Sequence, residues 1–495
     1  MRLTIMLTGI FLLAEIPGRA GFINIGHSKQ FFFDDKIVES LRDTRRILNP
    51  AEKVANNPIL RPERPWEGNT LTISLVYYDD EENLFKMRYG CSNIKARQQG
   101  GKTVFEGYTV PSEISNTCLA VSEDGIHWER PSLGLVEFRG SKDNNILPPE
   151  WLMGYIYRDL HTPDSAQRFR AHERIGEMSE PGMIFNAFTS PDGKQWQPYA
   201  GNPIIRYTGT GRWGPTNFMG WDPIRKVYAV FMENCLHRIC PLHKRVIGRA
   251  ESPDGIHWSE PETIILPDEN DPPDLEFYEL AATPYDGILM GMLWNFRSSA
   301  ATHHPELVLS RDGVRFQRDF RQPFIARGAQ GEFDHISLLA VNPVVHGDRI
   351  YYYYYGRNSR SLVTLEELGE RAIGAIGLAT LPRDGFVSLD GGKDRFSVMV
   401  TRSFSFSGSQ LYVNFDSALE KAWGGGPGDV RVEVLSANHQ PLEGLGFEDV
   451  DPVRTGNRAQ LITWKGRSDL SHLAEQSIRL RFHFKNARLY SFWFQ

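Results

Sequence analysis

The chain has 495 residues, of which 41% are hydrophobic and 23% charged, so it is long enough for two or three globular domains with ordinary cores. Its 55 basic and 61 acidic residues give a net charge of -6. They form no long basic run that could neutralise phosphates, which argues against nucleic acid as a partner.

The N-terminus has the organisation of a signal peptide. Arg2 is followed by an apolar stretch over residues 5–14, and then by Gly18 and Ala20 at the small-residue positions that precede a cleavage site. An uncleaved anchor is the alternative, but the apolar run is too short to span a bilayer, and no later segment is long enough. We therefore expect cleavage of residues 1–20, a secreted or periplasmic mature chain and no membrane span.

An internal repeat predicts the fold of the next part of the chain. The pattern S-x-D-G-x-x-aromatic begins at Ser122, Ser190, Ser252 and Ser310, and a degenerate fifth copy surrounds Asp384. Asp-Gly between apolar runs is typical of hairpin turns, because glycine adopts the positive φ that they require. The spacing of the copies suits one four-stranded antiparallel sheet per repeat. The repeat therefore predicts a five-bladed β-propeller over residues 21–392, with an unrelated β-sandwich that carries such turns as the alternative.

The two ends of this repeat region have patterns of their own. Near the N-terminus, the three phenylalanines at 31–33 and the segment 36–38 could supply the strand that closes the propeller. After about residue 393, apolar residues alternate with polar ones, as in Leu411, Val413 and Phe415. This alternation predicts a β-sandwich over residues 393–495. Long helical periodicity is nearly absent, so the predicted fold class is all-β.

The four cysteines form two pairs that are close in sequence, Cys91 with Cys118 and Cys235 with Cys240. Export permits disulfides, although spacing alone does not prove the pairing. Cys235, His237, Cys240 and His243 could instead bind zinc, but their spacing is not that of a standard zinc finger. We favour a small disulfide loop between Cys235 and Cys240.

Propellers bind ligands at the mouth of the central channel, and an acidic or imidazole side chain is expected there at the head of the innermost strand of each unit. A ring of carboxylates from different blades suits cleavage of a glycosidic bond, because one carboxyl must be protonated to assist the leaving oxygen and another must be ionised. Singly, each acid could be a solvated turn residue, as Pro223 after Asp222 suggests. The predicted catalytic residues, which should point into one pocket, are Glu67, Asp159, Asp222 and Glu279.

Aromatic, cationic and further polar side chains near these acids are the predicted substrate-binding residues. Aromatic faces stack on sugar rings, and arginine binds acids through two hydrogen bonds. The predicted residues are Trp66, Arg158, His237, Arg238, Arg249, Trp294, Arg297, Asp334 and His335. The chemistry requires no cofactor, although acids in such a ring could hold a structural calcium ion.

Several of these features resemble a known family. The five-unit organisation, the Asn57-Pro58-Ile59-Leu60 segment followed by Trp66-Glu67, the Arg158-Asp159 pair and the S-x-D-G-x-x-W turns are similar to the five-bladed glycosidase superfamily that includes glycoside hydrolase families 32, 43, 68, 117 and 130. The resemblance covers roughly residues 30–390. It implies a triad of carboxylates from inner strands of different blades, and the Arg-Asp pair points to Asp159.

One motif of this chain differs from the family pattern, and the chain also resembles a second group of proteins. Where family 32 has Asn-Asp-Pro on the first inner strand, this chain has Glu67-Gly68-Asn69. The chain also resembles a group of secreted bacterial proteins that share the opening Phe33-Asp34-Asp35 and the ending at Tyr490-Ser491-Phe492-Trp493. That group implies the architecture and not a reaction.

Together these observations favour a secreted glycoside hydrolase that acts on a poly- or oligosaccharide. A non-catalytic glycan-binding propeller is the alternative. A sialidase-like enzyme is a third interpretation that fits less well, because sialidases have six blades, a tyrosine nucleophile and three arginines. The sequence leaves the oligomeric state and the glycan open.

Overall fold

The computed structural model describes residues 23–100, 102–106, 112–151, 154–175, 183–207, 212–235, 244–359, 373–393, 395–417 and 428–495. These residues are almost entirely strands and loops, with helix only in short 3₁₀ turns at Pro149–Trp151 (η1), Ser165–Gln167 (η2) and Ser471–Leu473 (η4). The predicted all-β class is confirmed. No helix in the described ranges is long and apolar enough to cross a membrane.

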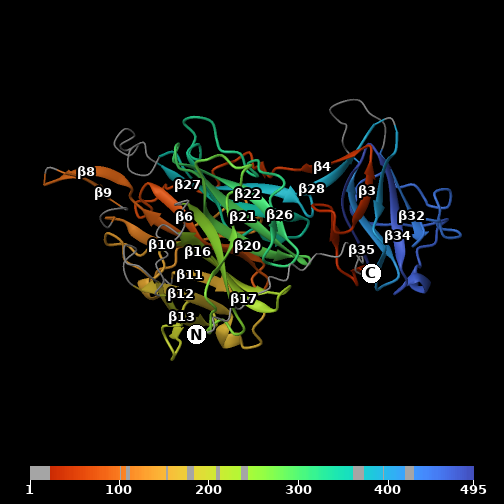
Figure 1. Ribbon diagram of the computed structural model, residues 1–495. Coiled ribbons are helices and arrows are strands. Elements are labelled where there is room, and N and C mark those ends of the chain that lie inside the picture. The colour runs from red at the N-terminus through yellow and green to blue at the C-terminus, as the bar shows by residue number, and fades with distance from the viewer. Residues whose placement is uncertain are drawn as a thin grey trace, which may run out of the picture. The chain divides into compact units, whose positions relative to one another are not determined.

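The described chain forms two compact units, residues 46–389 and residues 23–45 with 390–495. In the larger unit, successive strands pair antiparallel in sheet groups, each named here by its first strand (Figure 1). The β6 group contains β6 (Thr70–Asp79), β7 (Leu84–Ser92) and β10 (Ser115–Ser122), while β8 (Lys95–Gln99) and β9 (Lys102–Glu106) form a separate two-stranded sheet. The β11 group contains β11 (Tyr155–Arg158), β12 (Phe169–Ile175), β13 (Met183–Ser190), β14 (Gln197–Pro198) and β15 (Ile205–Tyr207).

The three remaining groups repeat this antiparallel order. The β16 group contains β16 (Arg212–Asp222), β17 (Val227–Cys235), β18 (Arg245–Ser252) and β19 (Glu262–Ile265). The β20 group contains β20 (Leu275–Tyr285), β21 (Ile288–Arg297), β22 (Thr302–Ser310) and β23 (Phe316–Gln317). The β24 group contains β24 (Ser337–Ala340), β25 (Val344–His346), β26 (Arg349–Arg357), β27 (Gly374–Pro382) and, on its edge, β5 (Glu52–Lys53). Single parallel pairs, Gly374 with Thr70 and His303 with Ser337, join the β6, β20 and β24 groups into one twelve-stranded sheet. Such a series of antiparallel groups is typical of a β-propeller-like fold.

The S-x-D-G turns follow one hydrogen-bond scheme, illustrated by the copy at Ser252. The Ser252 hydroxyl accepts the N–H of Gly255, and Oδ1 of Asp254 accepts the N–H groups of Ile256 and His257. The copies at Asp124, Asp192 and Asp312 repeat these bonds. Glycine is required because φ at Gly255 is +80°. The predicted equivalence of these turns is confirmed for four copies, and the degenerate fifth at Asp384 has its own geometry, with φ of 65° at the aspartate itself.

Each of the five turns is also bound by a side chain from the preceding sheet group. In chain order these contacts are Arg88 to Gly193 O, Arg170 to Asp254 O, Arg249 to Gly313 O, Tyr285 to Asp384 Oδ1 and Tyr353 to Gly125 O. The last contact leads from the β24 group back to the β6 group. The repeated turns therefore link neighbouring groups in a closed series.

The second unit has two six-stranded sheets. One has the order β1 (Ile23–Asn24), β30 (Phe404–Ser405), β34 (Ile478–Lys485), β29 (Ser397–Thr401) and β3 (Val38–Arg42), with β32 (Asp429–Ser436) beside β34. The other has the order β33 (Asn457–Leu461), β31 (Leu411–Asp416), β35 (Arg488–Phe494), β28 (Val387–Gly391) and β4 (Thr44–Leu48), with β2 (Gln30–Phe31) beside β35. The ring centroid of Phe482 in the first sheet lies 5.5 Å from that of Phe492 in the second, so aromatic rings fill the space between the sheets. This is the packing expected of a β-sandwich.

The N-terminal strands correct one prediction from the sequence. We expected residues 31–38 to close the propeller, but β2 pairs with β35 and β3 pairs with β29 in the second unit. The physical reason is the fully buried Phe32, whose ring centroid lies 6.5 Å from that of Phe482 and 6.1 Å from that of Phe492. The boundaries accordingly fall after Arg45 and Leu389, and not at a single point near residue 392.

Candidate functional site

A cavity of about 980 Å³ lies in the larger unit. Its walls come from the first strands of four groups, β6, β11, β16 and β20, and from residues 341–346, which follow β24. The first strand of each group, or the segment after it, therefore borders one shared space. Because those strands belong to different sheet groups, side chains far apart in the sequence meet there.

Aromatic residues form much of the cavity wall. They are Tyr77, Tyr78, Tyr155, Tyr157, Phe218, Trp221, Trp294 and Tyr355. Such side chains offer flat apolar faces and, in tyrosine and tryptophan, a polar tip. A cavity with this lining and a few polar groups suits a small or extended ligand that has both apolar faces and hydroxyl groups.

Glu279 on β20 is the predicted catalytic residue that lines this cavity. Burial raises its pKa to about 8, and no hydrogen bond or ion pair to a described residue offsets that effect. Burial and then the negative charge of Glu279 raise the pKa of Tyr155 on β11. Glu279 is therefore a carboxyl group that holds its proton at neutral pH inside the cavity.

Two hydrogen-bonded asparagine side chains, called here the amide belt, link β16 to β20 along the cavity wall. Asn217 Nδ2 donates to Asn342 Oδ1 at 2.7 Å, and Asn342 Nδ2 donates to Ala282 O at 2.7 Å. Thr283 Oγ1 lies 3.3 Å from the same nitrogen. These bonds hold hydrogen-bonding groups at fixed positions on the wall.

Charged and aromatic side chains border the cavity where the innermost strands end in hairpin turns. The residues are Tyr77 and Asp80 from the β6 group, Arg158 and His161 from the β11 group, and Trp221 from the β16 group. The rings of His161 and Trp221 are parallel within 4° with centroids 3.5 Å apart. This end of the cavity therefore combines stacking surfaces with a guanidinium group.

Asp159 and Asp222 do not line the cavity, contrary to prediction. Both are in hairpin turns, Asp159 directly after β11 and Asp222 at the end of β16, and Oδ1 of each accepts backbone N–H groups of its turn. Oδ2 of Asp159 lies 2.8 Å from Arg170 Nε and accepts from the Tyr228 hydroxyl at 2.9 Å. The sequence pattern placed these acids at the start of the inner strand, whereas in the structure Asp159 follows β11 and Asp222 ends β16.

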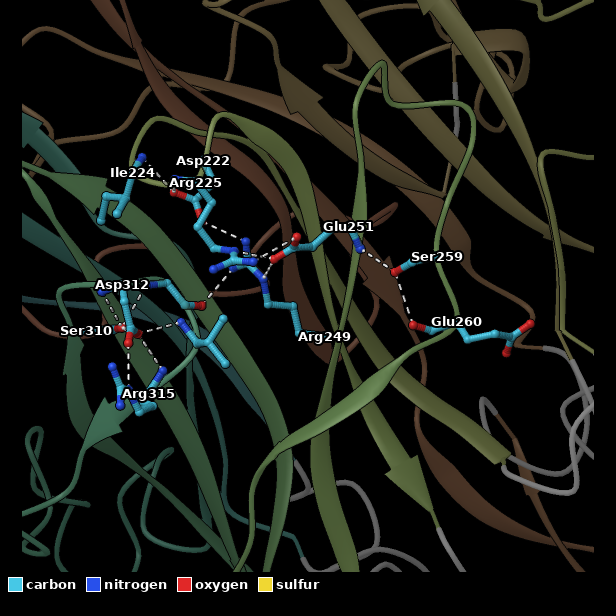
Figure 2. A network of polar contacts seen from close by, with 12 residues as sticks. Asp222, Ile224, Arg225, Arg249, Glu251, Ser259, Glu260, Ser310, Asp312 and Arg315 are labelled. Carbon is cyan, nitrogen blue, oxygen red and sulfur yellow. Dashed lines mark hydrogen bonds and ion pairs between the residues drawn. The ribbon is translucent and has the colours of Figure 1, made fainter. Parts of the chain in front are cut away.

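Arg249 is likewise a structural residue and not a cavity residue. Its Nη2 donates to Asp222 Oδ2 at 2.7 Å, its Nε donates to Glu251 at 2.8 Å and its Nη1 donates to Gly313 O at 2.9 Å. Figure 2 shows Arg249 between the two carboxylates, near the turn at Asp312. All three guanidinium nitrogens are thus bound inside the protein.

Glu67 is also outside the cavity lining and is fully buried. Its Oε1 accepts from Arg130 Nε and the Tyr89 hydroxyl, both at 2.7 Å, and its Oε2 accepts from backbone N–H groups. Trp66, next in the chain, donates from Nε1 to Asn145 Oδ1 at 2.8 Å. Neither residue lines the cavity, because this segment forms an internal hydrogen-bond network of the β6 group.

Of the other predicted substrate-binding residues, some line the cavity and some do not. Trp294 lines the cavity and donates from Nε1 to Ala340 O, and Arg158 lines it as described above. Asp334 is buried against Lys53 and Tyr354, Arg297 pairs with Asp274, and His335 Nδ1 lies 3.0 Å from Glu332 O, all outside the cavity lining. The structure therefore brings together Glu279, Arg158 and Trp294 from the predicted set.

Some predicted features lie outside the described residues. These are the predicted signal peptide at residues 1–20 and, further along the chain, His237, Arg238, Cys240 and His243, so the disulfide between Cys235 and Cys240 stays a prediction. Cys91 and Cys118 are buried thiols with their Sγ atoms 3.5 Å apart. Within the described ranges, no group of three or more histidine, cysteine, aspartate or glutamate residues is arranged to hold a metal ion.

Several cavity-lining residues were missed in the sequence because they are aromatic or amide side chains. Tyr155, Asn217 and Trp221 lie on β11 and β16, the first strands of their groups, but they are not acids, so a search for carboxylates passed over them. A search for aromatic and amide groups on these strands would have found them.

Comparisons with known proteins give structural neighbours only. No family model and no curated protein matches the chain. A glycosyl hydrolase from Bacteroides ovatus is 12% identical with a TM-score of 0.41, covering 67% of this chain and 94% of that one. A β-1,2-mannobiose phosphorylase from Listeria innocua is 11% identical with a TM-score of 0.41 and coverages of 67% and 96%. An N-acetylgalactosamine deacetylase from F. plautii is 13% identical with a TM-score of 0.41 and coverages of 74% and 95%.

Proposed function

We propose that this protein is a secreted glycoside hydrolase whose cavity binds a poly- or oligosaccharide and in which Glu279 is the proton donor. The single observation that supports the proposal best is a carboxyl group with a pKa of about 8 on the wall of a large, aromatic-lined cavity. A protonated carboxyl group can donate a hydrogen bond, and then a proton, to the oxygen of the departing sugar.

The second role in hydrolysis needs another carboxylate, which attacks the sugar or activates water. Among the described residues that line the cavity, Asp80 is the only other carboxylate. It is therefore our candidate for that role. The tyrosine hydroxyls and the amide belt of Asn217 and Asn342 would orient sugar hydroxyl groups.

We also infer that the five sheet groups are the blades of a five-bladed β-propeller. The closed series of turn contacts and the shared cavity support this inference. An experimental structure with a further blade, or with the Asp-Gly turns at unrelated positions, would overturn it.

Assays of the mature chain test the proposed reaction. The protein is incubated with plant and algal polysaccharides, and reducing ends and released oligosaccharides are measured. On any substrate that is cleaved, E279Q should lower turnover about 100-fold or more, because the amide preserves shape but cannot donate the proton. E260Q, at an exposed position, is the matched control and should retain full turnover. Equal turnover of E279Q and the wild type on a confirmed substrate would refute the role of Glu279.

Glycan binding without cleavage is the second candidate function. It is favoured by the internal hydrogen bonds and ion pairs of Glu67, Asp159 and Asp222, because these three predicted catalytic acids do not line the cavity. Binding of a glycan to both the wild type and E279Q, with no product from either over the whole panel, would favour this function.

A further inference from the structure

Arg158 is distinctive among the residues that line the cavity. In the described part of the wall it is the only arginine or lysine. It lies at the end of β11, and its guanidinium is 5.7 Å from the centre of the Tyr77 ring. A positive charge beside an aromatic wall therefore marks one end of the cavity.

The charge of Arg158 is only partly compensated by the protein. Nη1 donates to Tyr78 O at 3.1 Å, and the same nitrogen lies 3.8 Å from Asp80, whose side chain is 80% exposed. An ion pair that long and that exposed contributes little. Nε is buried with no hydrogen-bond partner among the described residues, and no described residue bonds Nη2. Because Nε is buried, the donors left for a ligand are the two N–H groups of Nη2 and the second N–H group of Nη1.

Arginines with structural roles in the same unit are different. Arg249 uses all three nitrogens on two carboxylates and a carbonyl, and Arg170 pairs with Asp159 and bonds Asp254 O. Neither lines the cavity. The fold therefore supplies buried carboxylates to Arg249 and Arg170, whereas Arg158 at the cavity has only the exposed Asp80 nearby.

The surroundings of Arg158 suit a sugar ring. His161 and Trp221 form a parallel stack that borders the same space, and Tyr77 lies beneath the guanidinium. A pyranose ring packs on such faces, while a planar carboxylate matches the fork of the guanidinium and accepts two hydrogen bonds from it.

We propose that this end of the cavity binds the carboxylate of a hexuronate residue, with Arg158 as the carboxylate-binding residue and Tyr77, His161 and Trp221 as its aromatic wall. The inference rests on the proposed function, because it names the class of sugar that the same cavity takes. The protein would thereby select acidic glycans over neutral ones.

Calorimetric titrations test this inference without relying on turnover. The probes are galacturonate and mannuronate trisaccharides and glucuronate-containing xylan oligosaccharides, each compared with its methyl ester, which keeps the shape but removes the charge. Titrations into wild type and E279Q should give about tenfold or tighter binding of at least one acid over its ester, because hydrogen bonds to charged groups are the stronger ones. R158Q should abolish that preference.

Two further variants complete the test, one as a second change of Arg158 and one as a control. R158K retains the charge but not the fork, so its preference for the acid should fall below that of the wild type, even if R158Q does not fold. R168Q removes a surface charge near the same turn, outside the cavity lining, and should bind like the wild type. The inference is wrong if no acid binds more tightly than its ester or if R158K equals the wild type. Cleavage of neutral glycans that requires Glu279, without any preference for acids, would overturn this inference and support the proposed hydrolase.

Discussion

Carboxyl groups that burial affects in this protein have two kinds of surroundings. Asp222 is fully buried but paired with Arg249 and bonded to backbone N–H groups, so its charge is compensated. Glu279 has no such partner among the described residues, and burial raises its pKa to about 8. Compensation by neighbours, more than burial itself, thus separates a structural acid from a candidate proton donor.

The raised pKa of Glu279 predicts how stability depends on pH. The folded state holds the proton more tightly than the unfolded state, whose glutamate has the ordinary pKa of 4.5, while the folded pKa is about 8. The stabilisation from this group is therefore complete below pH 4.5 and is lost as the pH rises towards 8. E279Q should lack this loss, so its free energy of unfolding should fall less than that of the wild type between these values. Urea unfolding at a series of pH values measures the difference, and parallel curves would contradict the assignment.

Removal of Arg249 should destabilise the larger unit. R249M leaves the buried Asp222 without its partner and removes the bond to Gly313 O, so the free energy of unfolding should fall by about 3 to 5 kcal/mol. Arg315 pairs with Asp312 at 2.7 Å but is 87% exposed, so R315Q should cost less than about 1 kcal/mol. Denaturant unfolding compares the two variants. Similar small losses in both would show that the buried pair has no structural role.

At the scale of elements, the S-x-D-G turns have two separable functions. Within a turn, the serine and aspartate side chains satisfy backbone N–H groups, which local sequence specifies. Between sheet groups, the carbonyl oxygens of four turns and the Asp384 carboxylate accept a bond from the preceding group. The repeat is therefore both a turn signal and part of the contact between sheet groups.

Two glycine variants separate these functions. G255A requires positive φ of alanine and places its Cβ 2.5 Å from Arg170 Nη1, so it strains the turn and disturbs the contact between groups. G287A has a φ of +87° but meets nothing within 4 Å, so only the backbone is strained, at about 1 kcal/mol. The melting temperature of G255A should therefore fall further than that of G287A. Equal shifts would mean that the contact with Arg170 adds nothing to stability.

At the scale of the whole molecule, the chain leaves the second unit after its first strands, forms the larger unit and then returns. Phe32, directly after β2, contacts rings on both sheets that the C-terminal part completes. Folding of the second unit therefore requires both ends of the described chain.

The F32A variant tests this dependence. Truncating a buried phenylalanine costs about 3 to 5 kcal/mol, and the loss should fall on the second unit alone. Limited proteolysis with mass spectrometry should then show earlier cleavage within residues 390–495, while cleavage within 46–389 keeps its wild-type rate. Earlier cleavage in the larger unit instead would contradict the division of the chain.

Local chemistry determined what the sequence could predict by itself. The all-β class and the four equivalent Asp-Gly turns follow from short-range preferences, namely alternation of apolar residues and glycine at positive φ, and both are present in the structure. The sequence also indicated Glu279, Arg158 and Trp294, which line the cavity.

Only the tertiary structure decided which acids are structural. Asp159, Asp222 and Glu67 each have a partner that the carboxylate pattern did not identify: Arg170 lies beyond a turn on the next strand, Arg249 comes from the third strand of its group, and Arg130 follows the β6 group's own turn. The N-terminal strands joined the second unit for a similar reason, since Phe32 packs against residues at the other end of the chain. Long-range partners are fixed by packing of the complete chain, so a local pattern identifies a carboxylate but not the charge or the ring that will face it.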